Sequence, residues 1–81
     1  MRICDAAKQI LIETDNPAVS LEDTGLIGLI AKRAGKLRDK EYPSDRHVRI
    51  INALSKQPGN LVPNFTLQAG TNRRIRLFRL P

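Results

Sequence analysis

The sequence predicts an α+β domain, in which a three-helix bundle is followed by a C-terminal two-stranded β-hairpin. Up to residue 57, apolar residues recur every three or four positions, which is the spacing of a buried helix face. From residue 64 onward they alternate with polar residues, which is the pattern of a half-buried strand. The chain has 81 residues, of which 41% are hydrophobic. This is enough for one small core, so we expect a single domain over residues 1–81.

The first helix is expected over residues 3–14. Its apolar residues follow the i, i+3, i+4, i+7, i+8 spacing that gathers side chains into one stripe. The tripeptide Asp15-Asn16-Pro17 ends this helix, because proline disfavours a helical conformation at the residue before it. Ala18 and Val19 then form a short extended link. The residues of the stripe are Ile3, Ala6, Ala7, Ile10 and Leu11.

The second helix is expected to begin at a capping box and to end at a glycine. Ser20-Leu21-Glu22-Asp23 places a serine before acidic residues, so Ser20 is the predicted N-cap. The helix runs through Ala34, and Gly35 is its predicted stop. A charged connector, residues 35–43, leads to the third helix.

The third helix is expected to begin at Pro43 and to end near Gln57, before the turn Pro58-Gly59. On a helical wheel, one arc is apolar and is expected to face the core. His47 lies in this arc, where a partly buried, hydrogen-bonded histidine is expected. The other arc is polar and is expected to face solvent. The inward arc consists of His47, Val48, Ile50, Ile51 and Leu54, and the outward arc consists of Arg46, Arg49, Asn52, Ala53 and Lys56.

The C-terminal residues predict the hairpin. Phe65, Leu67 and Ala69 alternate with polar residues, and Ile75 and Leu77 alternate with Arg74 and Arg76. Gly70-Thr71-Asn72 supplies the turn between the two strands. The alternation slips at Leu77-Phe78, which predicts a bulge or the end of the strand there.

The basic charge is confined to one part of the chain. The formal net charge is +6, yet no Asp or Glu follows Asp45. Such segregation is typical of a surface that meets phosphate or another polyanion. Lys32 and Arg33 form part of a second basic cluster, either as complements of the helix dipole or as backbone contacts.

Other function classes find little support in the residues. Cys4 is the only cysteine and His47 the only histidine, so neither a disulfide nor a Cys/His zinc site can be assembled. No nucleophile is paired with a base, and no glycine-rich phosphate loop is present. We therefore expect no enzyme activity and no cofactor. No apolar run is long enough to span a bilayer, so we expect no membrane association and a cytoplasmic or nuclear location.

The element order resembles the winged helix-turn-helix superfamily. Three short segments are similar to its HARE-HTH type: Asp5-Ala6-Ala7-Lys8-Gln9-Ile10-Leu11, Ser20-Leu21-Glu22-Asp23 and Tyr42-Pro43-Ser44-Asp45. The connector departs from that outline because it is long and charged. The resemblance implies a third helix that lies in the major groove and a wing that touches the adjacent backbone or the minor groove.

The expected function is binding of double-stranded DNA by a small transcriptional regulator. Two alternatives stay open: a winged-helix interaction module or inhibitor that docks on an acidic protein, and a basic component of a ribonucleoprotein. The oligomeric state is open between monomer and homodimer. The candidate DNA-binding residues are Arg46, Arg49, Asn52 and Lys56 on the helix and Arg73, Arg74 and Arg76 on the wing.

Overall fold

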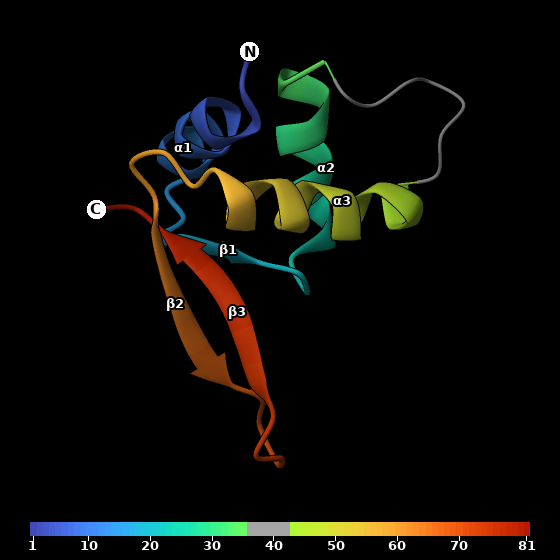
Figure 1. Cartoon of the computed structure of the whole chain (residues 1–81), viewed down its shortest axis with the longest axis vertical. Coiled ribbons are helices and arrows are strands. Elements are labelled where there is room, and N and C mark those ends of the chain that lie inside the picture. The colour runs from blue at the N-terminus through green and yellow to red at the C-terminus, as the bar shows by residue number, and fades with distance from the viewer. Residues whose placement is uncertain (36–42) are drawn as a thin grey trace.

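A computed structural model of the chain describes the backbone of residues 1–35 and 43–81 and the side chains of residues 1–35 and 47–81. Most of the predicted connector therefore lies outside the described residues. Three helices and a three-stranded antiparallel sheet are present, as the α+β prediction requires, and the outer part of the hairpin projects away from the helices (Figure 1). The elements are α1 (Ile3–Glu13), β1 (Ala18–Ser20), α2 (Thr24–Arg33), α3 (Pro43–Lys56), β2 (Val62–Leu67) and β3 (Arg74–Arg79).

The core lies where the three helices meet the base of the sheet. The predicted stripe of α1 is buried, except for the half-buried Ile3 at its start. Each helix contributes aliphatic side chains, and Phe78 is the one large aromatic residue among the fully buried side chains of the described chain. No helix in the described ranges is long and apolar enough to cross a bilayer. The central contributions are Leu11 from α1, Ile27 and Ile30 from α2, Leu54 from α3, and Val19 and Phe78 from the sheet.

The predicted two-stranded hairpin is part of a larger sheet, because the link after α1 forms a third strand. The strand order is β1-β3-β2, which places β3 in the centre. Val19 pairs with Phe78, and both side chains are fully buried. Removing two apolar side chains from water stabilises this pairing. Three residues are too few for an alternating pattern, so the sequence alone indicated only an extended link.

The predicted capping box at Ser20 is wrong. Ser20 belongs to β1, and α2 begins at Thr24 with Asp23 as its N-cap residue. The Asp23 carboxylate accepts hydrogen bonds from the Ser20 backbone N–H at 2.8 Å and from the Ser20 hydroxyl at 3.3 Å. The polar pair thus closes the turn between β1 and α2. Gly35 follows α2 with a φ of 72°, as expected for the stop that glycine provides.

Of the two outcomes predicted at Leu77-Phe78, the bulge is wrong, and the strand ends one residue further on, at Arg79. The β2–β3 register is continuous from Leu67↔Arg74 to Val62↔Arg79. Arg74, Arg76 and Phe78 share one face, which passes from solvent at the outer end of the hairpin to the core at its base. The apparent slip in the alternation therefore arises because one face of β3 is exposed to solvent at its outer end and buried at its base. Arg79 lies on the opposite face and is exposed.

Candidate nucleic-acid interface

Helix α3 presents a polar face to solvent. Arg49, Asn52 and Lys56 are exposed, as predicted, whereas Ala53 is half-buried. His47, Ile50, Ile51 and Leu54 face inward at the i, i+3, i+4, i+7 spacing. The backbone of Arg46 belongs to α3, but its side chain is outside the described residues.

Val48 corrects the predicted inward arc of α3. Its side chain is 52% exposed, although the sequence pattern placed it in the core. The buried stripe of α3 begins at His47 and lies along one side of the helix. Val48 falls outside this stripe, next to Asn52 one turn later, and therefore faces solvent. The outward face of α3 thus combines cationic and amide groups with one aliphatic side chain.

The hairpin carries arginines on its projecting end. Arg73, Arg74 and Arg76 are exposed there, as predicted. The register pairs Arg76 with Phe65 and Arg74 with Leu67, so these four residues share one face. The Arg76 guanidinium carbon lies 5.9 Å from the centre of the Phe65 ring, a cation–π arrangement.

Phe65 and Leu67 add an apolar component to the wing that the sequence analysis did not single out. They are 54% and 68% exposed, respectively. The sequence did contain a signal for this placement. In a hairpin with its turn at residues 70–72, the alternation sets Phe65 and Leu67 opposite Arg76 and Arg74. Their exposure shows that the helices do not cover the outer end of this face.

One hydrogen bond joins the wing to α3. The Arg76 guanidinium donates to the Ser55 hydroxyl at 3.0 Å, and this hydroxyl donates to the Ile51 carbonyl at 2.9 Å. Ser55 is in the last turn of α3, where Asn52 and Lys56 are its neighbours. Ser55 therefore links Arg76 of the wing to the end of α3 that carries Lys56.

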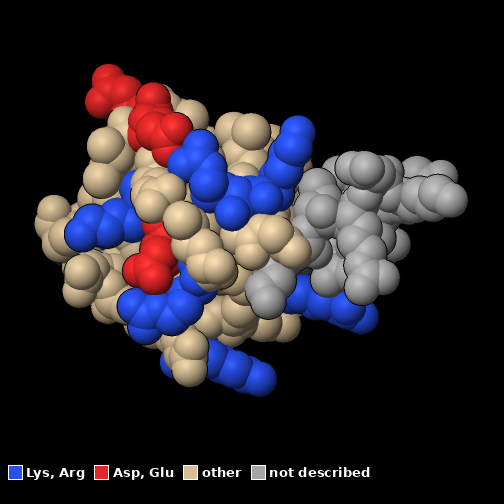
Figure 2. Space-filling model, turned by 90° about the horizontal axis from the view of Figure 1, so that it is seen from above, with Lys and Arg blue, Asp and Glu red and all other residues tan. Residues whose placement is uncertain are grey.

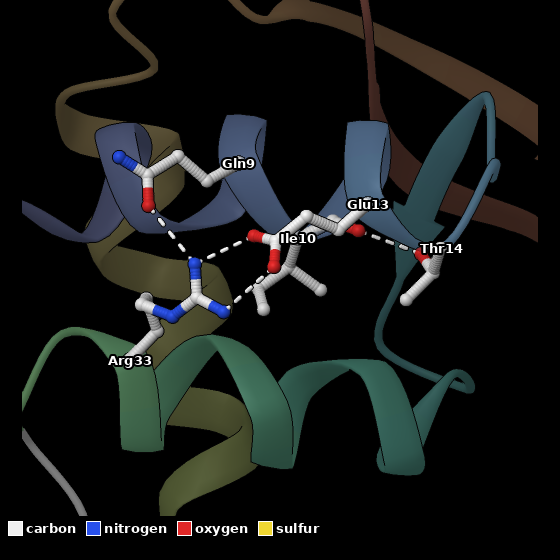
Figure 3. Close-up of polar contacts among 5 residues, drawn as sticks. All are labelled: Gln9, Ile10, Glu13, Thr14 and Arg33. Carbon is white, nitrogen blue, oxygen red and sulfur yellow. Dashed lines mark hydrogen bonds and ion pairs between the residues drawn. The ribbon is translucent and has the colours of Figure 1, made fainter.

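Two arginines on the helical side of the molecule, Arg2 and Arg33, are paired with carboxylates. The Arg33 guanidinium donates to the two Glu13 carboxylate oxygens at 2.6 and 2.9 Å and to the Gln9 side-chain oxygen at 3.0 Å (Figure 3). The hydrogen bond from Arg33 holds the pKa of Glu13 below its usual range, and the same bond raises the pKa of Arg33. Arg33 thus ties α2 to α1.

The side opposite the hairpin tip has mixed charge. Seen from that side, acidic and basic side chains are interspersed among uncharged ones (Figure 2). Arg2 and Asp5 of this region also form an ion pair, at 3.0 Å. By contrast, no carboxylate side chain exists anywhere after Asp45. In space, Glu22 is an exception to this segregation, because it lies beside Arg73, Arg74 and Arg76.

His47 is buried more fully than predicted, with 8% of its surface exposed. The predicted hydrogen bond is not found at Nε2, which has no partner within the described chain. Among these same residues, no group of three or more His, Cys, Asp or Glu side chains is placed to hold a metal ion.

Comparison with protein-family models, with curated proteins and with solved structures finds no match to this chain.

Proposed function

We propose that this chain is a winged helix-turn-helix protein that binds double-stranded DNA and acts as a small transcriptional regulator. The observation that carries the proposal is the set of exposed cations on α3 and the hairpin, two elements that the Arg76–Ser55 hydrogen bond joins. The element order and the β1-β3-β2 sheet agree with such a domain. In this arrangement α3 enters the major groove and the hairpin is the wing.

The side chains of α3 suit the edges of base pairs and the phosphates beside them. Arg49 offers a guanidinium fork that matches the two acceptors of guanine, and Asn52 offers an amide that matches adenine. Lys56 supplies a point charge for a phosphate at the end of the helix. Arg46 is assigned to the same surface on its sequence position alone.

The wing supplies the second set of contacts. Arg73, Arg74 and Arg76 are exposed on an element that extends beyond the helices, where they can reach a phosphate backbone or a minor groove. Phosphate contacts fix orientation but carry little sequence information, whereas base contacts specify sequence. We therefore assign sequence preference mainly to α3 and affinity mainly to the wing.

The deciding experiment is a binding titration with three probes: duplex DNA, single-stranded DNA and structured RNA. We expect a preference for the duplex. With about four to six phosphates neutralised, the logarithm of the binding constant should fall against the logarithm of salt with a slope of about −4 to −5. A preference for RNA would favour the ribonucleoprotein alternative. Failure to bind any nucleic acid at low salt would refute the proposal and favour an acidic protein partner.

A further inference from the structure

The central strand β3 is only partly covered on the side away from β2. β1 pairs with β3 at three positions, the last of which is Ser20↔Leu77. The chain then turns away, as the hydrogen bond from the Asp23 N–H to the Ser20 carbonyl shows. Arg74, Ile75 and Arg76 extend beyond the end of β1 with β2 as their only strand partner in the described chain.

The pairing pattern fixes which backbone groups point to this uncovered side. The Gln68 N–H donates to the Arg73 carbonyl at 3.0 Å, so Gln68 and Arg73 form a hydrogen-bonded pair. Bonded and non-bonded pairs alternate along an antiparallel ladder. The N–H and C=O groups of Arg74 and Arg76 therefore point away from β2. We call these outward-pointing groups the open edge of β3.

A groove of about 160 Å³ runs along the open edge. Leu21 and Ile51 provide apolar surface, and the β3 side is formed by the segment Arg73–Arg76. Glu22 is the one carboxylate among the described residues that line it, against three arginines. The groove thus has the backbone groups of a strand edge, an apolar wall and a positive charge.

The β2 side of the hairpin offers fewer backbone groups to a further strand. By the same alternation, residues 63, 65 and 67 of β2 direct their backbone groups outward. Pro63 has no N–H to offer. The N–H of Phe65 already donates to the Asn64 side-chain oxygen at 2.8 Å. Of the two sides of the hairpin, that of β3 is therefore the more open to a further strand.

We propose that the open edge of β3 binds an extended acidic segment of a partner protein, which continues the sheet where β1 ends. Strand addition supplies main-chain hydrogen bonds, and acidic side chains opposite Arg74 and Arg76 supply the charge match. A second copy of this chain is a poor occupant, because pairing two open edges would place arginines opposite arginines. The acidic strand would occupy the wing arginines, so it would compete with DNA; this last consequence alone rests on the proposed function.

The test uses a short, capped peptide that alternates Glu and Val and carries a fluorescent label. In the expected register, Glu residues lie opposite Arg74 and Arg76, so the Glu backbone groups form the bonded pairs. N-methylation of the Glu residues should weaken binding by about tenfold or more, because it removes these donors. N-methylation of the Val residues should leave the affinity within about twofold, because their N–H groups face solvent. Equal effects of the two modifications would overturn the proposal, and so would an absence of binding.

Two variants test the protein side of the pairing. Arg74→Ala and Arg74→Pro both remove the charge, but only the proline also removes the outward N–H. We expect the proline variant to bind the peptide about fivefold more weakly than the alanine variant. Circular dichroism checks that both retain the sheet. If the proline variant does not fold, binding of the two N-methylated peptides to the unaltered chain still tests the proposal.

Hydrogen exchange in the free protein provides an independent measurement. The amides of Arg74 and Arg76 should exchange rapidly, whereas the amide of Ile75, which pairs with Thr66, should be protected. Peptide binding should then protect Arg74 and Arg76. Rapid exchange of these amides in the complex would contradict strand addition.

DNA is added only after the peptide has been tested alone. Displacement of a bound duplex by the peptide is the expected result. Peptide binding without any duplex binding would refute the proposed function and leave the strand site intact. Duplex binding without peptide binding would refute only the strand site.

Discussion

The two ends of strand β3 show how one element serves two purposes. At its base, Phe78 is fully buried and pairs with both Val19 and Pro63. At its outer end, on the same face, Arg74 and Arg76 are exposed beside Leu67 and Phe65. The strand is thus held by apolar burial at one end and presents cations at the other. Stability and surface chemistry are separated along a strand of six residues.

The same separation applies to the whole molecule. In the helical region, Arg33 is paired with Glu13, and Arg2 is paired with Asp5. On the wing and on α3 beyond Asp45 no residue carries a carboxylate, and Glu22 is the acidic residue beside the wing arginines. Paired surface charges contribute little to affinity for a partner, whereas an uncompensated basic surface attracts polyanions. Substitutions in the two regions should therefore affect different measurements.

The largest expected effect is at the base of β3. Phe78→Ala should lower the free energy of unfolding by about 3–5 kcal/mol, because it removes a fully buried aromatic side chain and leaves a cavity. The matched change Phe65→Ala should cost about 1 kcal/mol or less, because that ring is largely exposed. Urea denaturation of both variants measures the difference. Equal losses would mean that the two ends of the hairpin are not separated as described.

A smaller loss is expected where the turn between α3 and β2 meets α1. Gly59 has a φ of 59°, and a Cβ placed there would lie 3.0 Å from Cys4 Sγ. Gly59→Ala should therefore lower stability by about 1–3 kcal/mol through backbone strain and a close contact. Combining it with Cys4→Ala should recover the part due to the sulfur, so the double variant should lose less than the sum of the single changes. Strict additivity in thermal denaturation would exclude the contact.

The third effect concerns binding and not stability. Arg49→Glu should weaken duplex binding by about tenfold and reduce the salt slope by about 1, because a cation of the proposed interface becomes an anion. Lys8→Glu makes the same charge change on α1 and should have a much smaller effect. Fluorescence anisotropy at several salt concentrations compares the two variants. Equal weakening would place the DNA site elsewhere.

The smallest effect is expected at the Arg33–Glu13 pair. Because the pKa of Glu13 is lowered in the folded chain, the pair stabilises the fold above the usual glutamate value of about 4.3. That stabilisation is lost as the pH falls through the lowered pKa. Glu13→Gln should therefore reduce the melting temperature slightly at pH 7 and have almost no effect at well below about pH 4. Binding of duplex DNA should not change, and a large change would contradict the separation of the two regions.

The elements with repeated periodicity could be predicted from the sequence, and the short ones could not. The stripe of α1 and the start of α3 at Pro43 follow from local spacing and proline chemistry. The role of Ser20 could not be predicted, because a serine followed by acids serves equally well in a cap or in a turn. The role of Ser20 is set instead by the pairing of the preceding Val19 with Phe78, two residues that are far apart in the sequence.

The candidate site divides in the same way. The exposure of Arg49, Asn52 and Lys56 follows from helical periodicity. The exposure of Val48 depends on which flank of α3 packs against α2 and α1, and this is a tertiary property. Likewise, the exposed apolar residues of the wing and its open edge depend on how far β1 extends along β3, which no local pattern encodes.

The pairing of β1 with β3 also determines when this protein can fold during synthesis. Val19 leaves the ribosome well before its partner Phe78, which lies far along the sequence. The helices can form as they emerge, since their contacts are local, while the sheet has to wait until β3 has been made. Until then the apolar surface that Phe78 covers is exposed to chaperones and proteases. A ribosome that stalls before Arg74 would therefore release a chain without its central strand, suited to degradation and not to function.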